Sequence, residues 1–350
     1  MASNTDLWIQ IGLGIGSMIC ATLVWYLRKQ ELKGIEYLCN AEKLEGPEKV
    51  QIINRAIDFQ KAQLARKDLF KEGRAEQAEN LGLAYEMLAN VQNRTANEAL
   101  ASRAYQESID WTLKGRNWKK YIERTMRLGN IYMKWTMDGD RARNLRDAIA
   151  EYNKALQTLE LRFPKNRLLR KEIISKLVGV DFRYAFEIND PRPLKDALSL
   201  INNQLSKLGP REENGFFYFY LDEHSILIEL LAFFENPTIN LKKAIEETNQ
   251  MIFFAIKINR PDLLLKHKIS MVRIYRKLAS LETPQENLNN ACNILLEIQD
   301  GANGMDPSTI EDLQKTIDET IKMIQGEAPL PSMQKSLIQQ KNQLFSKSDN

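Results

Sequence analysis

The sequence predicts an all-α protein, a solenoid of helical hairpins preceded by one transmembrane helix. Three observations predict this fold. Apolar residues in every long segment recur with a period near 3.6, and the two-residue alternation of β-strands is absent. An alanine in a helix-like context returns every 47 to 49 residues between Ala101 and Ala291. A run of 21 uncharged residues, Leu7 to Leu27, precedes these repeats.

Composition is that of a folded protein with an ordinary charge balance. The chain has 350 residues, of which 43% are hydrophobic and 27% charged, and these values exclude wholesale disorder. The net charge of +3 is too small to indicate a nucleic-acid-binding protein by itself. Cys20, Cys39 and Cys292 are far apart, which fits neither a disulfide framework nor a metal site and favours a reducing compartment.

The first 30 residues are predicted to form a membrane anchor. A helix over Leu7 to Leu27 is about 30 Å long, which matches the hydrocarbon thickness of a bilayer. Trp8 and Trp25 lie near its two ends, where aromatic rings prefer the membrane interface. A cleaved signal peptide is the alternative, but Met1 to Asp6 lacks the basic residues and the run lacks the A-x-A site of such a peptide.

The charges that flank the anchor predict its orientation. Basic residues crowd the segment 28–33, whereas Asp6 is the only charge on the other side. The short N-terminus is therefore expected outside and the repeats in the cytoplasm. A bacterial inner membrane is favoured, with the outer membrane of a mitochondrion or other organelle as the alternative. Gly12 and Gly16 have the spacing that lets two anchors pack together, so self-association is a further hypothesis.

The repeats are predicted to be helix pairs. The second helices carry the recurring alanine, at positions 101, 148, 197, 244 and 291, with steps of 47, 49, 47 and 47 residues. The first helices carry a glycine followed three residues later by an aromatic, as in Gly82 with Tyr85 and Gly129 with Tyr132; Gly179 with Phe182 keeps this spacing. A small residue lets the partner helix approach, and the aromatic fills the space beside it. Such a pair cannot bury its apolar face alone and must stack on copies of itself.

These features divide the chain into four parts. Residues 1–30 form the anchor, and residues 31–300 are expected to hold about six helix pairs. Residues 301–326 contain one capping helix, whose narrow apolar stripe suits a face packed on the last pair. Residues 327–350 are a polar tail rich in Lys, Gln and Ser. The five aromatic residues Phe216 to Tyr220 are interpreted either as core filling or as an exposed groove for a ligand.

The best-formed pair resembles a known repeat family. Leu128-Gly129-Asn130-Ile131-Tyr132, followed by Ala148 to Tyr152, is similar to the tetratricopeptide pattern W-x2-L-G-x2-Y…A-x3-F. The resemblance covers roughly residues 31–300, strongly in two pairs and partly in the others. The period of 47 instead of 34, and Ala78 and Thr125 in place of Trp, are departures. The HEAT repeat, the alternative, has the right length but lacks the L-G-x2-Y signature.

The resemblance implies a right-handed superhelix whose concave face, lined by first helices, binds a peptide or a partner helix. The groove positions carried over from the family are Glu79, Leu83, Glu86, Met126, Asn130 and Met133. Family members that bind the C-terminal carboxylate of a chaperone need Lys and Asn at the first two positions. Glu79 and Leu83 stand there, so the resemblance does not extend to that activity.

A basic stretch adds a second candidate surface. From Lys114 to Lys176 there are 17 Lys or Arg and 7 Asp or Glu, a net charge of 17 − 7 = +10. Its first members are Lys114, Arg116, Lys119, Lys120, Arg124 and Arg127. One interpretation is a solvated helix face. The other is a patch for an acidic protein or for anionic lipid beside the anchor. Nucleic acid ranks third because no recognised binding motif accompanies the charge.

The sequence gives no sign of catalysis. Its two histidines, His224 and His267, are 43 residues apart, and no nucleotide-binding, hydrolase or metalloprotease motif occurs. We therefore predict no enzyme activity, catalytic residue, metal or cofactor. The expected function is a membrane-anchored scaffold or adaptor that recruits protein partners at the cytoplasmic face. The alternatives are a mitochondrial outer-membrane receptor for incoming polypeptides and a structural subunit of a membrane or organelle assembly complex.

Overall fold

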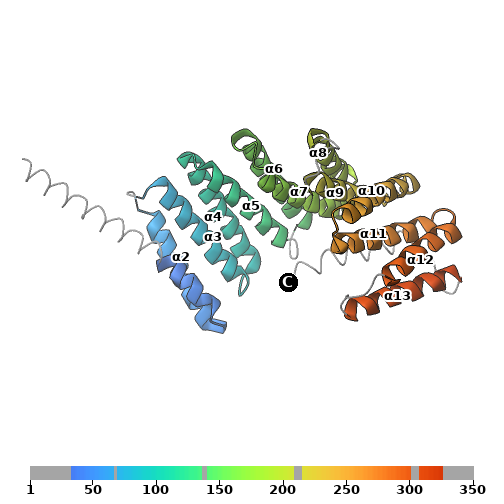
Figure 1. The fold of residues 1–350 in the computed structure, drawn as a ribbon. Helices are drawn as coiled ribbons and strands as arrows, with labels where there is room; N and C mark the ends of the chain where they lie inside the picture. Colours follow the sequence, from blue (N-terminus) through green and yellow to red (C-terminus); the bar gives the residue numbers. More distant parts are fainter. Residues whose placement is uncertain (1–32, 67–68, 136–139, 209–214, 301–306, 326–350) are drawn as a thin grey trace, which may run out of the picture. The chain divides into compact units, whose positions relative to one another are not determined.

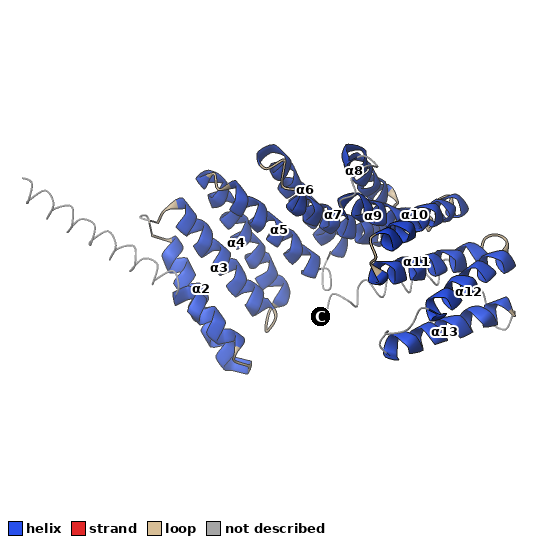
Figure 2. Ribbon diagram, viewed as in Figure 1, coloured by secondary structure: helices blue, strands red, loops and turns tan. Residues whose placement is uncertain are grey.

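The computed structural model describes residues 33–66, 69–135, 140–208, 215–300 and 307–325. Every regular element in these ranges is a helix, and none of the described residues forms a strand (Figures 1 and 2). Successive helices pack antiparallel in pairs that repeat along the chain. The prediction of an all-α, solenoid-like helical-repeat fold is confirmed.

The predicted membrane anchor at residues 1–30 lies outside these ranges, and so does the predicted tail at 327–350. Within the described part of the chain, no helix combines the length and the apolar character that a membrane crossing requires. The transmembrane helix over residues 7–27 therefore stays a prediction from the sequence.

The helices fall into two compact units. The first unit extends to Gly139 and includes Lys154–Pro164, and the second holds Asp140–Asn153 and the chain from Lys165 onward, so that α6 (Arg141–Arg162) contributes to both. The first unit contains a helix over residues 33–42, α2 (Gly46–Leu64), α3 (Lys71–Ala89), α4 (Arg94–Gly115) and α5 (Trp118–Lys134). The second contains α7 (Arg167–Ile188), α8 (Arg192–Leu208), α9 (Gly215–Leu231), α10 (Pro237–Lys257), α11 (Pro261–Ala279), α12 (Pro284–Asp300) and α13 (Pro307–Ile324).

Small residues set the packing within pairs. The recurring alanines at 101, 148, 197, 244 and 291 are completely buried. Gly82 on α3 lies against the ring of Tyr105 on α4, where an added Cβ would come within 2.9 Å of three ring atoms. This contact is the close approach that the sequence predicts for the pair. Gly179 on α7 differs, because an added Cβ there would meet nothing within 4 Å.

Asparagines shape the turns between the helices of a pair. Asn93, Asn189 and Asn236 adopt left-handed backbone conformations, which Asn tolerates better than most residues. A second asparagine, four residues before the buried alanine, ties its own helix to the turn that precedes it. The Asn240 side chain donates a 2.8 Å hydrogen bond to the carbonyl of Glu235. Asn97 and Asn287 make the same bond to the carbonyl five residues earlier, at 2.8 and 2.7 Å.

Each unit has a continuous apolar core. In the first unit, buried side chains from the 33–42 helix to α5 form one cluster that includes Leu38, Ile53, Tyr105 and Leu128. At the end of the second unit, α13 packs on α12 and places Ile317 in a cluster with residues of α11 and α12. The last helix therefore covers apolar surface that the preceding pair leaves open.

Candidate functional site

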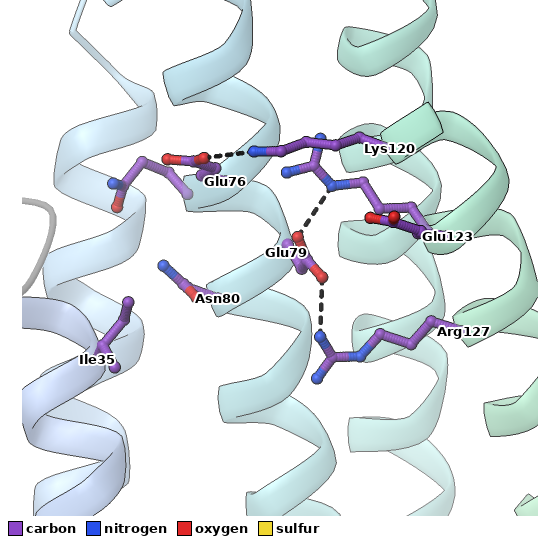
Figure 3. A pocket seen from close by; sticks show the side chains of 9 residues that line it. Ile35, Glu76, Glu79, Asn80, Lys120, Glu123 and Arg127 are labelled. Carbon is purple, nitrogen blue, oxygen red and sulfur yellow. Dashed lines mark hydrogen bonds and ion pairs between the residues drawn. The ribbon is translucent and has the colours of Figure 1, made fainter. Parts of the chain in front are cut away.

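The strongest candidate site lies on the first helices of the first unit. There, the 33–42 helix, α3 and α5 border two cavities of about 510 Å³ each (Figure 3 shows the first). The first cavity is lined by Ile35, Glu76, Gln77, Glu79, Asn80, Lys120, Glu123, Arg124 and Arg127. The second is lined by Leu83, Glu86, Arg127, Asn130, Ile131 and Lys134. Arg127 belongs to both, so the two cavities are neighbours along one face, which we call the α3/α5 face.

Charges of opposite sign line the two sides of this face. Helix α3 carries glutamates at positions 72, 76, 79 and 86, and α5 carries Lys or Arg at 120, 124, 127 and 134. Each cation comes 48 residues after a glutamate: 72 + 48 = 120, 76 + 48 = 124, 79 + 48 = 127 and 86 + 48 = 134. Spacings of four and three residues keep each set on one side of its helix. The two stripes therefore face each other one repeat apart.

The stripes are joined by ion pairs along their whole length. Glu79 accepts hydrogen bonds from Arg124 at 2.9 Å and from Arg127 at 2.8 Å, and Figure 3 shows the contact between Glu79 and Arg127. The ammonium of Lys120 lies 2.9 Å from both Glu72 and Glu76. Farther along, Lys134 pairs with Glu86 at 3.1 Å. The two first helices are thus held together by direct polar contacts at one-repeat spacing.

Neighbouring charges and hydrogen bonds keep Glu72 and Lys120 charged at neutral pH. Burial acts to raise the pKa of Glu72, but the neighbouring Lys120 and Arg124 more than offset it and hold that pKa below its usual value. Hydrogen bonds to Glu72 and Glu76 raise the pKa of Lys120 above its usual value. Arg124 is only 6% exposed and bonds two of the glutamates as well as Thr112. Glu72 and Lys120 are therefore both charged at neutral pH, and they pair with each other between the helices.

The structure places most predicted groove residues on this face. Glu79 lines the first cavity, and Leu83, Glu86 and Asn130 line the second. Met126 is buried instead, because it lies on the side of α5 that packs inward. Met133 is partly exposed and lines neither cavity.

The predicted basic residues divide into two groups. Lys120, Arg124 and Arg127 line the first cavity and pair with glutamates of α3. Lys114, Arg116 and Lys119 are exposed near the turn between α4 and α5, and the Lys114 ammonium lies 4.1 Å from the centre of the Trp111 ring. Half of the predicted basic residues therefore belong to the α3/α5 face, together with the predicted groove residues.

Sequence reasoning missed the acidic partners of these cations. Glu72 and Glu76 lie outside the basic stretch from Lys114 to Lys176, so a charge count over that stretch alone leaves them out. The sequence does carry a signal for these partners. The glutamates of α3 and the cations of α5 have the same spacing, and the two sets lie 48 residues apart. Asn80, Glu123 and Ile35 also line the first cavity without any sequence signal that marked them.

The second unit repeats the same kind of contact between first helices. Lys266 of α11 pairs with Asp222 of α9 at 2.6 Å, 44 residues away. Glu229 of α9 is 3% exposed and is bonded by Lys277 at 2.6 Å and by Arg273 at 2.8 and 2.9 Å. Burial acts to raise the pKa of Glu229, and the two cations lower it below its usual value. Contacts at one-repeat spacing therefore hold first helices together in both units.

The second unit contains further buried polar side chains, among them His224, His267 and Asp181. His224 pairs with Glu247 at 2.9 Å, and His267 lies 3.7 Å from Asp222. Burial, with the nearby charge of Asp196, raises the pKa of Asp181 to about 8, so this carboxyl holds a proton at neutral pH.

The aromatic run 216–220 lies in the first two turns of α9. Tyr220 is buried, and the residues before it are half-buried. The Tyr218 ring stacks on Phe254 of α10 with 3.3 Å between ring centres. The Lys171 ammonium lies 4.1 Å from the centre of the Phe219 ring. The run therefore joins α7, α9 and α10, and Phe216 also lines a small cavity.

Comparisons with known proteins assign the chain to no family. No protein-family model matches the sequence, and no curated protein matches it. A solved circular tandem repeat protein with novel repeat topology and enhanced subunit contact surfaces shows 12% identity over 87% of this chain and 79% of its own, with a TM-score of 0.33. A computationally designed self-assembling cyclic homooligomer shows 15% identity over 95% of both chains, with a TM-score of 0.13. We draw no argument from these two TM-scores. The helices of the chain themselves define it as a helical-repeat protein.

Proposed function

We propose that this chain is a tetratricopeptide-like scaffold that binds a protein partner on the α3/α5 face. The observation that carries the proposal is the pair of adjacent cavities of about 510 Å³ on one face of the first helices. Helical repeats offer such continuous surfaces to other proteins. The cavities contain four of the six groove positions that the family resemblance implies: Glu79, Leu83, Glu86 and Asn130.

The charge arrangement favours a particular kind of partner. Because the glutamates of α3 neutralise the cations of α5, the face has little long-range attraction for a strongly acidic or basic protein. Short-range contacts remain, namely the amide of Asn80, the side chain of Leu83 and carboxylate oxygens beside the cavities. We therefore propose a peptide segment or helix of mixed polar and apolar character, with little net charge.

The wider setting of the scaffold is proposed from the sequence. Residues 7–27 would anchor the chain in a membrane with the repeats on the cytoplasmic side, because the run is uncharged and basic residues follow it. Anchoring raises the effective concentration of bound partners at the membrane without any new contact. The proposed role is recruitment without catalysis.

Site-specific photocrosslinking in the cells that produce the protein tests the binding face. A photoreactive residue at position 83 is expected to give a discrete protein adduct, because Leu83 lines the second cavity. The same residue at position 100 should give none, because Leu100 is an exposed side chain of α4 that lines neither cavity.

A blocking substitution makes the test specific to the cavities. Asn80→Trp fills the first cavity without changing any charge and is expected to weaken the adduct from position 83 at least about tenfold, since losing one well-packed contact costs over 1 kcal/mol. Leu100→Trp is the matched control and should leave the adduct intact. Equal adducts from positions 83 and 100, or an adduct indifferent to Asn80→Trp, would contradict the proposed face.

A further inference from the structure

A third cavity, of a different character, lies within the second unit. Its volume is about 100 Å³, and it is enclosed by the first turn of α7, the last turns of α8 and the first turns of α9. The lining residues are Arg167, Arg170, Gln204, Lys207, Leu208, Phe216 and Tyr220. Three of these side chains are cationic and none is acidic, which contrasts with the neutralised cavities of the first unit.

Basic residues gather in the three chain segments that border this cavity. The segments 165–171, 200–208 and 215–221 contain five Lys or Arg and no Asp or Glu. The N-terminus of α7, which begins at Arg167, adds the positive end of a helix dipole. Helix α8 ends at the same place and its last carbonyls oppose an anion, but Lys207 lies in that last turn.

A buried amide supplies an independent sign of a ligand. Gln204 is 3% exposed, and its Nε2 atom has no hydrogen-bond acceptor among the described residues. A buried donor without an acceptor costs about 1–3 kcal/mol, so such groups normally have a partner. Because Gln204 lines the cavity, an acceptor placed there would satisfy it. The phenol of Tyr220, which also lines the cavity, keeps its proton because burial raises its pKa to about 12, and it can donate a further hydrogen bond.

We propose that the cavity between α7, α8 and α9 binds a phosphate group. Phosphate offers acceptor oxygens in several directions, which suits two guanidinium groups, one ammonium, one amide and one phenol converging on a small space. The phosphate belongs either to a small soluble molecule or to the headgroup of a lipid. The site is independent of the partner-binding face, so either proposal can fail without the other.

Titration of the full-length chain with inorganic phosphate tests the site. At constant ionic strength, phosphate but not chloride is expected to raise the melting temperature and to give a saturable binding isotherm by calorimetry. Arg170→Gln and Lys207→Gln should each weaken binding at least about tenfold, because a hydrogen bond between charged groups contributes about 1.5–3 kcal/mol. Arg146→Gln, an exposed arginine of α6 outside the cavity, is the matched control and should bind as the wild type does.

Gln204→Leu separates a ligand contact from a structural role. Leucine is close to glutamine in size but removes the unsatisfied donor, so the variant should melt no lower than the wild type in chloride and should lose most of the shift caused by phosphate. A lower melting temperature in chloride would mean that the amide serves the protein core, and it would overturn the assignment.

Two further arms identify the source of the phosphate. Tighter binding of glycerol 3-phosphate than of inorganic phosphate would indicate a soluble monoester. Stronger retention on phosphatidylcholine vesicles that contain phosphatidic acid than on phosphatidylcholine alone, with this difference lost in the Arg170→Gln/Lys207→Gln variant, would indicate a lipid headgroup. Absence of phosphate binding, or unchanged binding in the Arg170 and Lys207 variants, would overturn the proposal.

Discussion

Glu229→Leu is expected to lower the free energy of unfolding by about 3–5 kcal/mol, because it leaves a buried cation without its carboxylate. Lys277 is 2% exposed and makes its closest polar contact, 2.6 Å, with Glu229. After the substitution, the Lys277 ammonium would keep only the Phe233 ring, 4.5 Å from its centre. Arg273 is less affected, since 44% of its side chain is exposed and can turn to water.

A second substitution should restore most of the free energy of unfolding that is lost in Glu229→Leu. In Glu229→Leu/Lys277→Met both buried charges are gone, and apolar residues of similar size usually replace a buried ion pair at little cost. Asp262→Asn breaks the exposed pair with Arg260 and is the control for a general effect of charge; its change should be small. Urea denaturation followed by circular dichroism measures all three variants. A loss for Glu229→Leu no larger than that for Asp262→Asn would contradict the buried triad.

The same triad predicts a dependence on pH. The pKa of Glu229 is lower in the folded protein than its ordinary value of 4.5, so the unfolded chain takes up a proton first as the pH falls. The stability that this carboxylate contributes is present above pH 4.5 and is lost as the pH falls toward the folded pKa. The wild type should therefore lose more stability than Glu229→Leu/Lys277→Met between pH 5 and pH 3.

Gly82→Ala and Gly179→Ala are expected to change stability in opposite directions. Alanine favours a helix over glycine by about 1 kcal/mol, and Gly179→Ala should gain up to that amount because the new methyl group meets nothing within 4 Å. At Gly82 the methyl group would lie 2.8 Å from the Tyr105 ring, and overpacking costs about 1–3 kcal/mol.

The Tyr105 ring has little freedom to move away from the added methyl group. It is 3% exposed, and its hydroxyl donates a 2.9 Å hydrogen bond to Glu86. Because the gain in helix propensity is common to both, we expect the two alanine variants to differ by the overpacking cost, about 1–3 kcal/mol, in thermal or urea unfolding. In a Tyr105→Leu background, the stability change caused by Gly82→Ala should come closer to that caused by Gly179→Ala. Equal effects at the two glycines would mean that α3 and α4 do not approach each other as closely as described.

The repeat fold could be predicted because its determinants are local and periodic. Buried alanines at a fixed spacing mark the second helices, and the structure buries each of them completely. Pro237, Pro261 and Pro284 each stand at the start of a helix, where their fixed backbone angle is tolerated. Asn240 and Asn287 are a further signal, since each precedes the repeat alanine by four residues and bonds to the preceding turn.

The site was less predictable because it depends on how helices far apart in sequence face each other. The resemblance predicts Glu79 and Glu86 as groove residues, and both lie on the α3/α5 face, but the pairing of Glu79 with Arg124 and Arg127 depends on the rotation of α5. The same rotation buries Met126, which the family pattern would place in the groove. Gly179 and Gly82 have similar local sequences and different surroundings, which only the packing decides. The unsatisfied amide of Gln204 likewise has no sequence signature.

Zero-length crosslinking tests most directly that successive first helices lie side by side, one repeat apart. A carbodiimide joins an amine to a carboxylate only when the two are in contact. We predict links from Lys134 to Glu86 and from Lys120 to Glu72 or Glu76 in the first unit, and from Lys266 to Asp222 in the second, identified by mass spectrometry of the digested full-length chain. Links from these lysines only to acids of their own helix, or to segments other than α3 and α9, would contradict the repeat packing.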